Sequence, residues 1–226
     1  MFGETENRLV LFRDGTYLEL IAFVNDDPEK RRRHWWDKPF GVVDFALTTK
    51  EDFDHQALNE RLKHSGTGIS YDEPREGGRK RPDGTELRWK VTFPKDIERG
   101  AVPFWCHDLT PRECRVPVDD NNSNHPCGAL GMAGVAIQAP QSRLSSLNQA
   151  LLAIVDGAMQ KDGSIGLDPP EQVEGAKRPS VRFSDAPEGS SGEVKLALIL
   201  RAGDSEVPVD IEQSIEGGVV SVRFER

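Results

Sequence analysis

One carboxylate interrupts an otherwise apolar strand near the start of the chain. The segments 7–12 and 17–24 flank Asp14-Gly15, a dipeptide that strongly predicts a β-hairpin. A two-residue turn at Asp14-Gly15 would place Glu19 opposite Val10 on the apolar face. A buried carboxylate is paired, protonated or bound to metal. The alternative is an edge strand on which Glu19 is solvated.

Length and charge restrict the class of protein. The 226 residues suffice for one large or two small domains. A net charge of -9 argues against binding to nucleic acid or to anionic membranes. The chain has no apolar run of the roughly 18 to 20 residues that a membrane span needs, and no signal-peptide pattern at its start, so we expect a cytoplasmic protein. The spacing of Cys106, Cys114 and Cys127 predicts free thiols.

The predicted elements occur twice in the same order. The first series is a strand at 42–48, a helix at 52–65, and strands at 69–72, 87–93 and 102–107. The second series is a strand at 133–139, a helix at 144–159, and strands at 181–183, 194–200 and 219–224. Charged or Pro- and Gly-rich segments at 75–81, 161–179 and 185–192 are predicted as surface loops.

This order predicts an α+β fold built from tandem β-α-β-β-β modules. We expect curled, mostly antiparallel sheets with the two helices on their outer faces, and 87–93 paired with 102–107. The first module is expected to be incomplete, because only a hairpin precedes the second. An unpaired edge beside 17–23 would then favour aggregation or a homodimer.

Four segments together resemble one known family. They are Thr5-Glu6-Asn7-Arg8, Tyr17 to Phe23, Arg81 to Trp89, and Val102 to Asp108. They are similar to the glyoxalase-like domain of the vicinal oxygen chelate superfamily, in the branch common in fungi, over about residues 3–140. The resemblance implies a glyoxalase-like domain at 1–130, with a truncated first module and a full second one, and an additional divergent half-module at 131–226.

The resemblance also implies a divalent-metal site formed by Glu19, Asp44 and His107. Related sequences often carry an acidic residue at the position of His107, and their usual histidine on a preceding strand has no counterpart here. One imidazole and two carboxylates can hold Fe(II), Mn(II) or Zn(II) and leave positions open for a substrate with two neighbouring oxygens. Glu19 is the candidate catalytic base.

Other interpretations of these residues stay open. His107 could be a core histidine held by hydrogen bonds, and Asp44 could pair with Arg88 or Lys90. Substrate contacts are expected from three residues, Tyr17, Arg88 and Trp105, although tryptophans are more often core residues.

Two function classes follow. The first is a metal-dependent lyase, isomerase or dioxygenase acting on a small oxygen-rich metabolite. The second is a protein without metal that binds a small molecule or has only a structural role. The superfamily contains both kinds, so the fold alone cannot decide between them. In the first class and in the binding form of the second, the partner is a small-molecule ligand.

Overall fold

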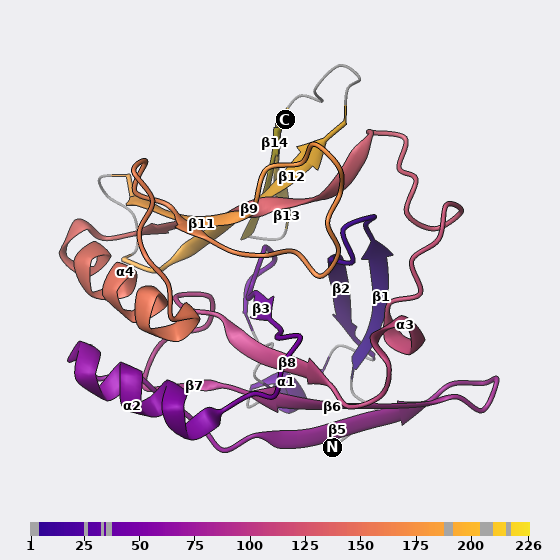
Figure 1. Cartoon of the computed structure of the whole chain (residues 1–226), viewed down its shortest axis with the longest axis horizontal. Coiled ribbons are helices and arrows are strands. Elements are labelled where there is room, and N and C mark those ends of the chain that lie inside the picture. Colours follow the sequence, from indigo (N-terminus) through magenta and orange to yellow (C-terminus); the bar gives the residue numbers. More distant parts are fainter. Residues whose placement is uncertain are drawn as a thin grey trace.

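Two mixed sheets dominate the computed structural model, which describes residues 5–24, 27–32, 34, 38–187, 192–203, 210–215 and 218–226. The six-stranded sheet has the order β10 (Ile165–Gly166), β11 (Ser180–Asp185), β9 (Ala129–Ala139), β12 (Lys195–Ala202), β14 (Gly218–Glu225) and β13 (Ile211–Ile215). The four-stranded sheet has the order β3 (Ala46–Leu47), β8 (Phe104–Asp108), β6 (Glu86–Thr92) and β5 (Arg75–Lys80). In Figure 1 the larger sheet lies above the smaller one.

Smaller elements complete the fold. The strands β1 (Thr5–Leu11) and β2 (Tyr17–Phe23) form a separate hairpin, and β4 (Ser70–Tyr71) pairs with β7 (Pro94–Lys95). The helices are α1 (Pro28–Arg31), α2 (His55–Ser65), α3 (Arg112–Arg115) and α4 (Gln141–Val155). No helix in the described ranges is long and apolar enough to cross a membrane.

The predicted hairpin is confirmed, but its predicted register is wrong by one residue. Glu19 lies opposite Leu9, not Val10. The loop has three residues, because only Gly15 takes a positive φ, of 73°, and its N–H donates to Phe12 O over 3.0 Å. This is the three-residue hairpin loop in which a residue with left-handed backbone angles forms a β-bulge.

The side chain of Asp14 explains this loop. Its carboxylate accepts hydrogen bonds from Thr16 N at 3.0 Å and from Met132 N of β9 at 2.9 Å. The hairpin tip is therefore attached to the six-stranded sheet. Further along the hairpin, Val10 and Leu18 pack against the cluster that Leu200 forms in this sheet.

Both long helices form where the apolar spacing predicts them, with shifted ends. The helix α2 begins after Asp54, whose carboxylate accepts from Ala57 N, and Gly66 ends it in the left-handed region with φ 68°. The helix α4 ends at Asp156, also left-handed. The two helices pack on each other through a shared core that includes Leu58, Leu62, Leu147 and Ile154. Figure 1 shows them together at one side of both sheets.

The segment 75–81, predicted as a loop, largely forms the edge strand β5. Its register with β6 places Gly77 opposite Trp89. A Cβ at Gly77 would lie 2.6 Å from Trp89 Nε1, so glycine leaves room for the indole ring. Conversely, the strand predicted at 42–48 is reduced to the two residues of β3.

The predicted pairing of 87–93 with 102–107 is confirmed, because β6 pairs antiparallel with β8. Strand–helix–strand order also occurs twice. The sheet orders around the two helices differ, however: β8 separates β3 from β6, whereas β9 lies between β11 and β12. An α+β fold with mixed sheets is therefore established, while identical tandem modules and the division at residue 130 stay predictions.

Candidate functional site on strand β8

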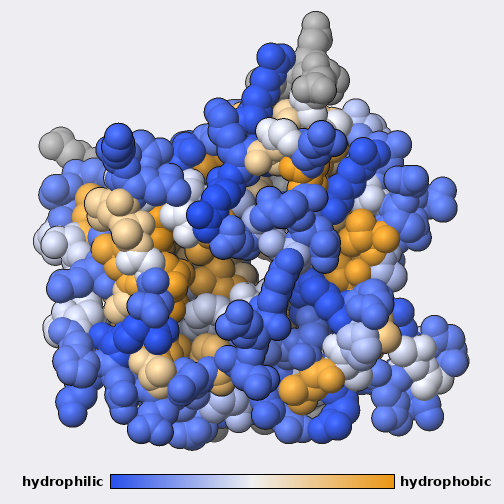
Figure 2. Space-filling view, in the orientation of Figure 1, coloured by the Kyte–Doolittle hydropathy of each residue, from blue (hydrophilic) through white to orange (hydrophobic). Residues whose placement is uncertain are grey.

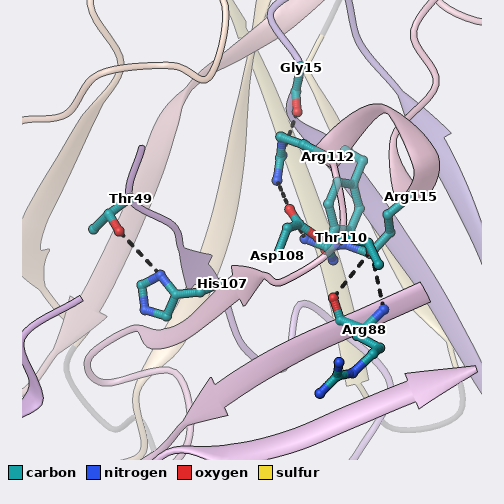
Figure 3. Close-up of polar contacts among 9 residues, drawn as sticks. Gly15, Thr49, Arg88, His107, Asp108, Thr110, Arg112 and Arg115 are labelled. Carbon is teal, nitrogen blue, oxygen red and sulfur yellow. Dashed lines mark hydrogen bonds and ion pairs between the residues drawn. The ribbon is translucent and has the colours of Figure 1, made fainter. Parts of the chain in front are cut away.

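Strand β8 presents its residues alternately to two different surroundings. Cys106 and Asp108 face the β1–β2 hairpin, whereas Trp105 and His107 face Phe53, which precedes α2. Figure 3 shows His107 and Asp108 pointing away from each other. The two faces of β8 therefore have different chemical surroundings.

On the helix side, His107 lies in an aromatic cluster. Its ring centroid is 4.3 Å from that of Phe53 and 5.5 Å from that of Trp105, on which it stacks. Thr49 Oγ1 donates its one proton to Glu51 O over 2.6 Å. Toward His107 Nδ1, 3.3 Å away, this oxygen can therefore only accept. His107 therefore carries its proton on Nδ1. Its buried Nε2 has no hydrogen-bond partner among the described residues.

Burial lowers the pKa of His107 to about 4. Because this pKa lies below the value of 6.5 expected in the unfolded chain, the neutral ring stabilises the fold above pH 6.5, and this contribution is lost as the pH falls toward 4.

We predict that His107→Phe, which keeps an aromatic ring but cannot titrate, reduces the acid sensitivity of the fold. Between pH 7 and pH 5 the wild type should lose roughly 1 to 2 kcal/mol more unfolding free energy than the variant. Urea unfolding at both pH values measures this difference. Parallel losses in the two proteins would show that His107 is not a buried neutral residue.

On the hairpin side, Asp108 binds two arginines. Arg115 Nε lies 2.5 Å from Asp108 Oδ1 and its Nη2 lies 3.0 Å from Oδ2, a bidentate pair. Arg112 Nη1 lies 3.0 Å from Asp108 Oδ2. Although burial alone would lower the pKa of Arg115, its hydrogen bonds to Asp108 raise it above its ordinary value. Arg115 is therefore positively charged.

The same arginines hold the hairpin. Arg112 Nη2 donates to Gly15 O at 2.7 Å (Figure 3). Arg115 Nη1 donates to Tyr17 Oη at 2.5 Å. Burial raises the pKa of Tyr17 to about 12 and also raises that of the Cys106 thiol. Both groups are therefore neutral at pH 7, and the thiol is a poor nucleophile. We call Tyr17, Asp108, Arg112 and Arg115 the Arg–Asp network.

The structure does not bring the three predicted metal ligands together. Glu19 is exposed and accepts a hydrogen bond from Asn7 Nδ2 at 2.5 Å. Asp44 is buried against Arg99, 3.2 Å away, rather than paired with Arg88 or Lys90. Burial raises the pKa of Asp44 to about 6.

In the described part of the chain, no three His, Cys, Asp or Glu side chains are placed to hold a metal ion. Of the three proposed ligands, only His107 offers an unpartnered atom, because Glu19 and Asp44 have other partners. The residues present therefore do not fit a metal held by Glu19, Asp44 and His107.

The three residues predicted to contact a substrate do not form one site either. Tyr17 belongs to the Arg–Asp network. Arg88 is exposed and pairs with Glu76 at 2.8 Å, and Trp105 is buried in the core beside α2. The sequence interpretation missed Asp108, Arg112 and Arg115. The available signal was the acidic residue at the end of an apolar strand, followed by two arginines after four and seven residues.

A family model for the glyoxalase-like domain matches residues 2–152. The chain belongs to the glyoxalase-like domain family. The matched range covers the hairpin, β8 and the Arg–Asp network. No curated protein matches this glyoxalase-like chain.

One solved structure, titled a hypothetical protein from Staphylococcus aureus, is similar in fold. The TM-score is 0.63 at 13% sequence identity, over 98% of this glyoxalase-like chain and 86% of that chain. At this identity the similarity concerns the fold alone. Membership of a fungal-type branch stays a prediction.

Proposed function

We propose that this glyoxalase-like protein binds a small oxygen-rich molecule on the hairpin side of β8, without a metal held by Glu19, Asp44 and His107. In the vicinal oxygen chelate superfamily it would then be a binding protein rather than a metal-dependent lyase, isomerase or dioxygenase. Arg112 is the residue that we expect to contact the ligand.

The observation that carries this proposal is the unused donor of Arg112. Its Nη atoms bind Asp108 and Gly15, but its buried Nε has no partner among the described residues. A buried donor without a partner is costly, and a ligand oxygen would satisfy it. About a quarter of the Arg112 side chain is exposed, which leaves a route for a ligand.

The surroundings of Arg112 suit a small ligand with polar and apolar parts. Tyr17 and Cys106 are neutral groups beside the two arginines. Figure 2 shows a hollow near the middle of this face of the molecule, with apolar surface along its left side. Comparison with Figure 1 puts the hollow between the hairpin and the two large sheets. We place the apolar part of the ligand there.

Thermal-shift screening of carboxylic acids, α-hydroxy ketones and catechols, with and without chelator, tests the proposal. We expect at least one class to raise the melting temperature equally under both conditions, because a ligand that binds only the folded state stabilises it. Stoichiometric Fe, Mn or Zn in protein purified without chelator, lost in Glu19→Gln, would overturn the proposal.

We predict that Arg112→Lys weakens binding of the best compound by about tenfold to a hundredfold, since hydrogen bonds to charged groups contribute about 1.5 to 3 kcal/mol. Lysine keeps the charge but lacks the Nε–H and the planar fork. Isothermal titration calorimetry measures the effect. Arg88→Lys, the same change at an exposed ion pair, is the control and should leave affinity unchanged. Equal affinity in both variants would exclude Arg112 as the contact.

A further inference from the structure

The last strand of the six-stranded sheet has an open edge. Strand β13 pairs with β14 from Ile211 to Ile215 in continuous register, without a bulge. No strand in the described ranges pairs with its other edge. All five of its residues are exposed, and the exposed fractions of Ile211 and Ile215 are 51% and 37%.

Two other sheet edges are protected in ways that β13 is not. Strand β10, at the opposite edge of the same sheet, has only two residues. Strand β5, at the edge of the smaller sheet, carries four charged residues, Arg75, Glu76, Arg79 and Lys80. Short length and charge are the usual protection against edge-to-edge pairing. Strand β13 has one charge, Glu212, and no proline or lysine.

The sequence of β13 is complementary to itself in the antiparallel direction. If a two-fold axis passes through Gln213, Ile211 lies opposite Ile215 of a second copy. Glu212 then lies opposite Ser214, so no like charges meet. Apolar cross-strand pairs stabilise a sheet, whereas directly opposed like charges destabilise it. A C2 contact of this kind closes on itself and does not propagate.

We propose that β13 pairs antiparallel with β13 of a second copy about Gln213, which joins two six-stranded sheets into one continuous sheet. The partner is a second copy because the pattern Ile-Glu-Gln-Ser-Ile matches its own reverse in its apolar positions and places no like charges opposite each other. This homodimer is independent of the proposed ligand site on β8. The hairpin strand β2 is the competing apolar edge, with Leu20 59% exposed.

Sedimentation equilibrium of the full chain over the micromolar range tests the dimer. We expect the wild type to dimerise and Gln213→Lys to weaken dimerisation by about tenfold or more, because two ammonium groups would then face each other at the axis. Gln213→Glu should weaken it similarly. A mixture of the Gln213→Lys and Gln213→Glu chains should restore dimers, since opposite charges then meet.

Leu20→Lys on β2 is the matched control and should leave the dimer intact. Circular dichroism melts confirm that the variants are folded, and residue 213 is exposed, so folding should be preserved. A wild type that stays monomeric throughout, or a dimer that Leu20→Lys disrupts and Gln213→Lys does not, would overturn the proposal.

Discussion

Asp108→Ala is expected to lower the free energy of unfolding by about 3 to 5 kcal/mol, the usual cost of removing one partner from a buried ion pair. The Asp108 side chain is 10% exposed, and its loss leaves Arg115, 11% exposed, without a counter-charge. The hairpin should also loosen, because the same arginines bind Gly15 and Tyr17. Urea unfolding measures the loss.

Glu76→Ala is the control for this prediction. It removes the carboxylate from an exposed pair with Arg88 on the same sheet, and should change the unfolding free energy by no more than about 0.5 kcal/mol. Similar losses in the two variants would contradict the difference that we assign to burial. The Arg–Asp network would then not hold the hairpin in place.

Gly134→Ala is expected to destabilise the fold by about 3 kcal/mol or more, because it combines backbone strain with a clash. Gly134 has φ 156° in β9, and an added Cβ would overlap Ser180 O of the neighbouring strand β11. No side-chain rotation can relieve a contact with backbone. Thermal and urea melts check the prediction.

Gly163→Ala is the control, because it introduces backbone strain without a steric clash. Gly163 has φ 79°, but a Cβ there would meet nothing within 4 Å. We expect a loss of about 1 to 2 kcal/mol, the cost of a left-handed alanine. If Gly134→Ala lowered the unfolding free energy no more than Gly163→Ala does, the result would contradict the close approach of β9 and β11 at Gly134.

Local patterns predicted most of the elements. Apolar spacing and a glycine end identified α2, and the strands predicted at 87–93 and 102–107 correspond to β6 and β8. The missed strand β5 is charged and contains Gly77 and Gly78, so it has no apolar pattern. Its position at the edge of a sheet, where charge is favourable, becomes evident only from the pairing of β6 with β8.

The candidate site could be predicted only in part. The sequence identified the end of β8, but which face of this strand meets the hairpin depends on tertiary packing. Both Trp105 and Cys106 are apolar, so alternation does not show that His107 faces α2 while Asp108 faces Tyr17. The register of the hairpin likewise depends on a tertiary contact, from Asp14 to Met132 N of β9. Such contacts leave no local pattern.

The most direct test of the proposed function is isothermal titration calorimetry of the best small oxygen-rich ligand against protein stripped with chelator. We predict that affinity is unchanged by the stripping and by Glu19→Gln, and falls by about tenfold or more in Arg112→Lys. Binding that requires added Fe(II), Mn(II) or Zn(II) and is lost in Glu19→Gln, but not in Arg112→Lys, would contradict this account.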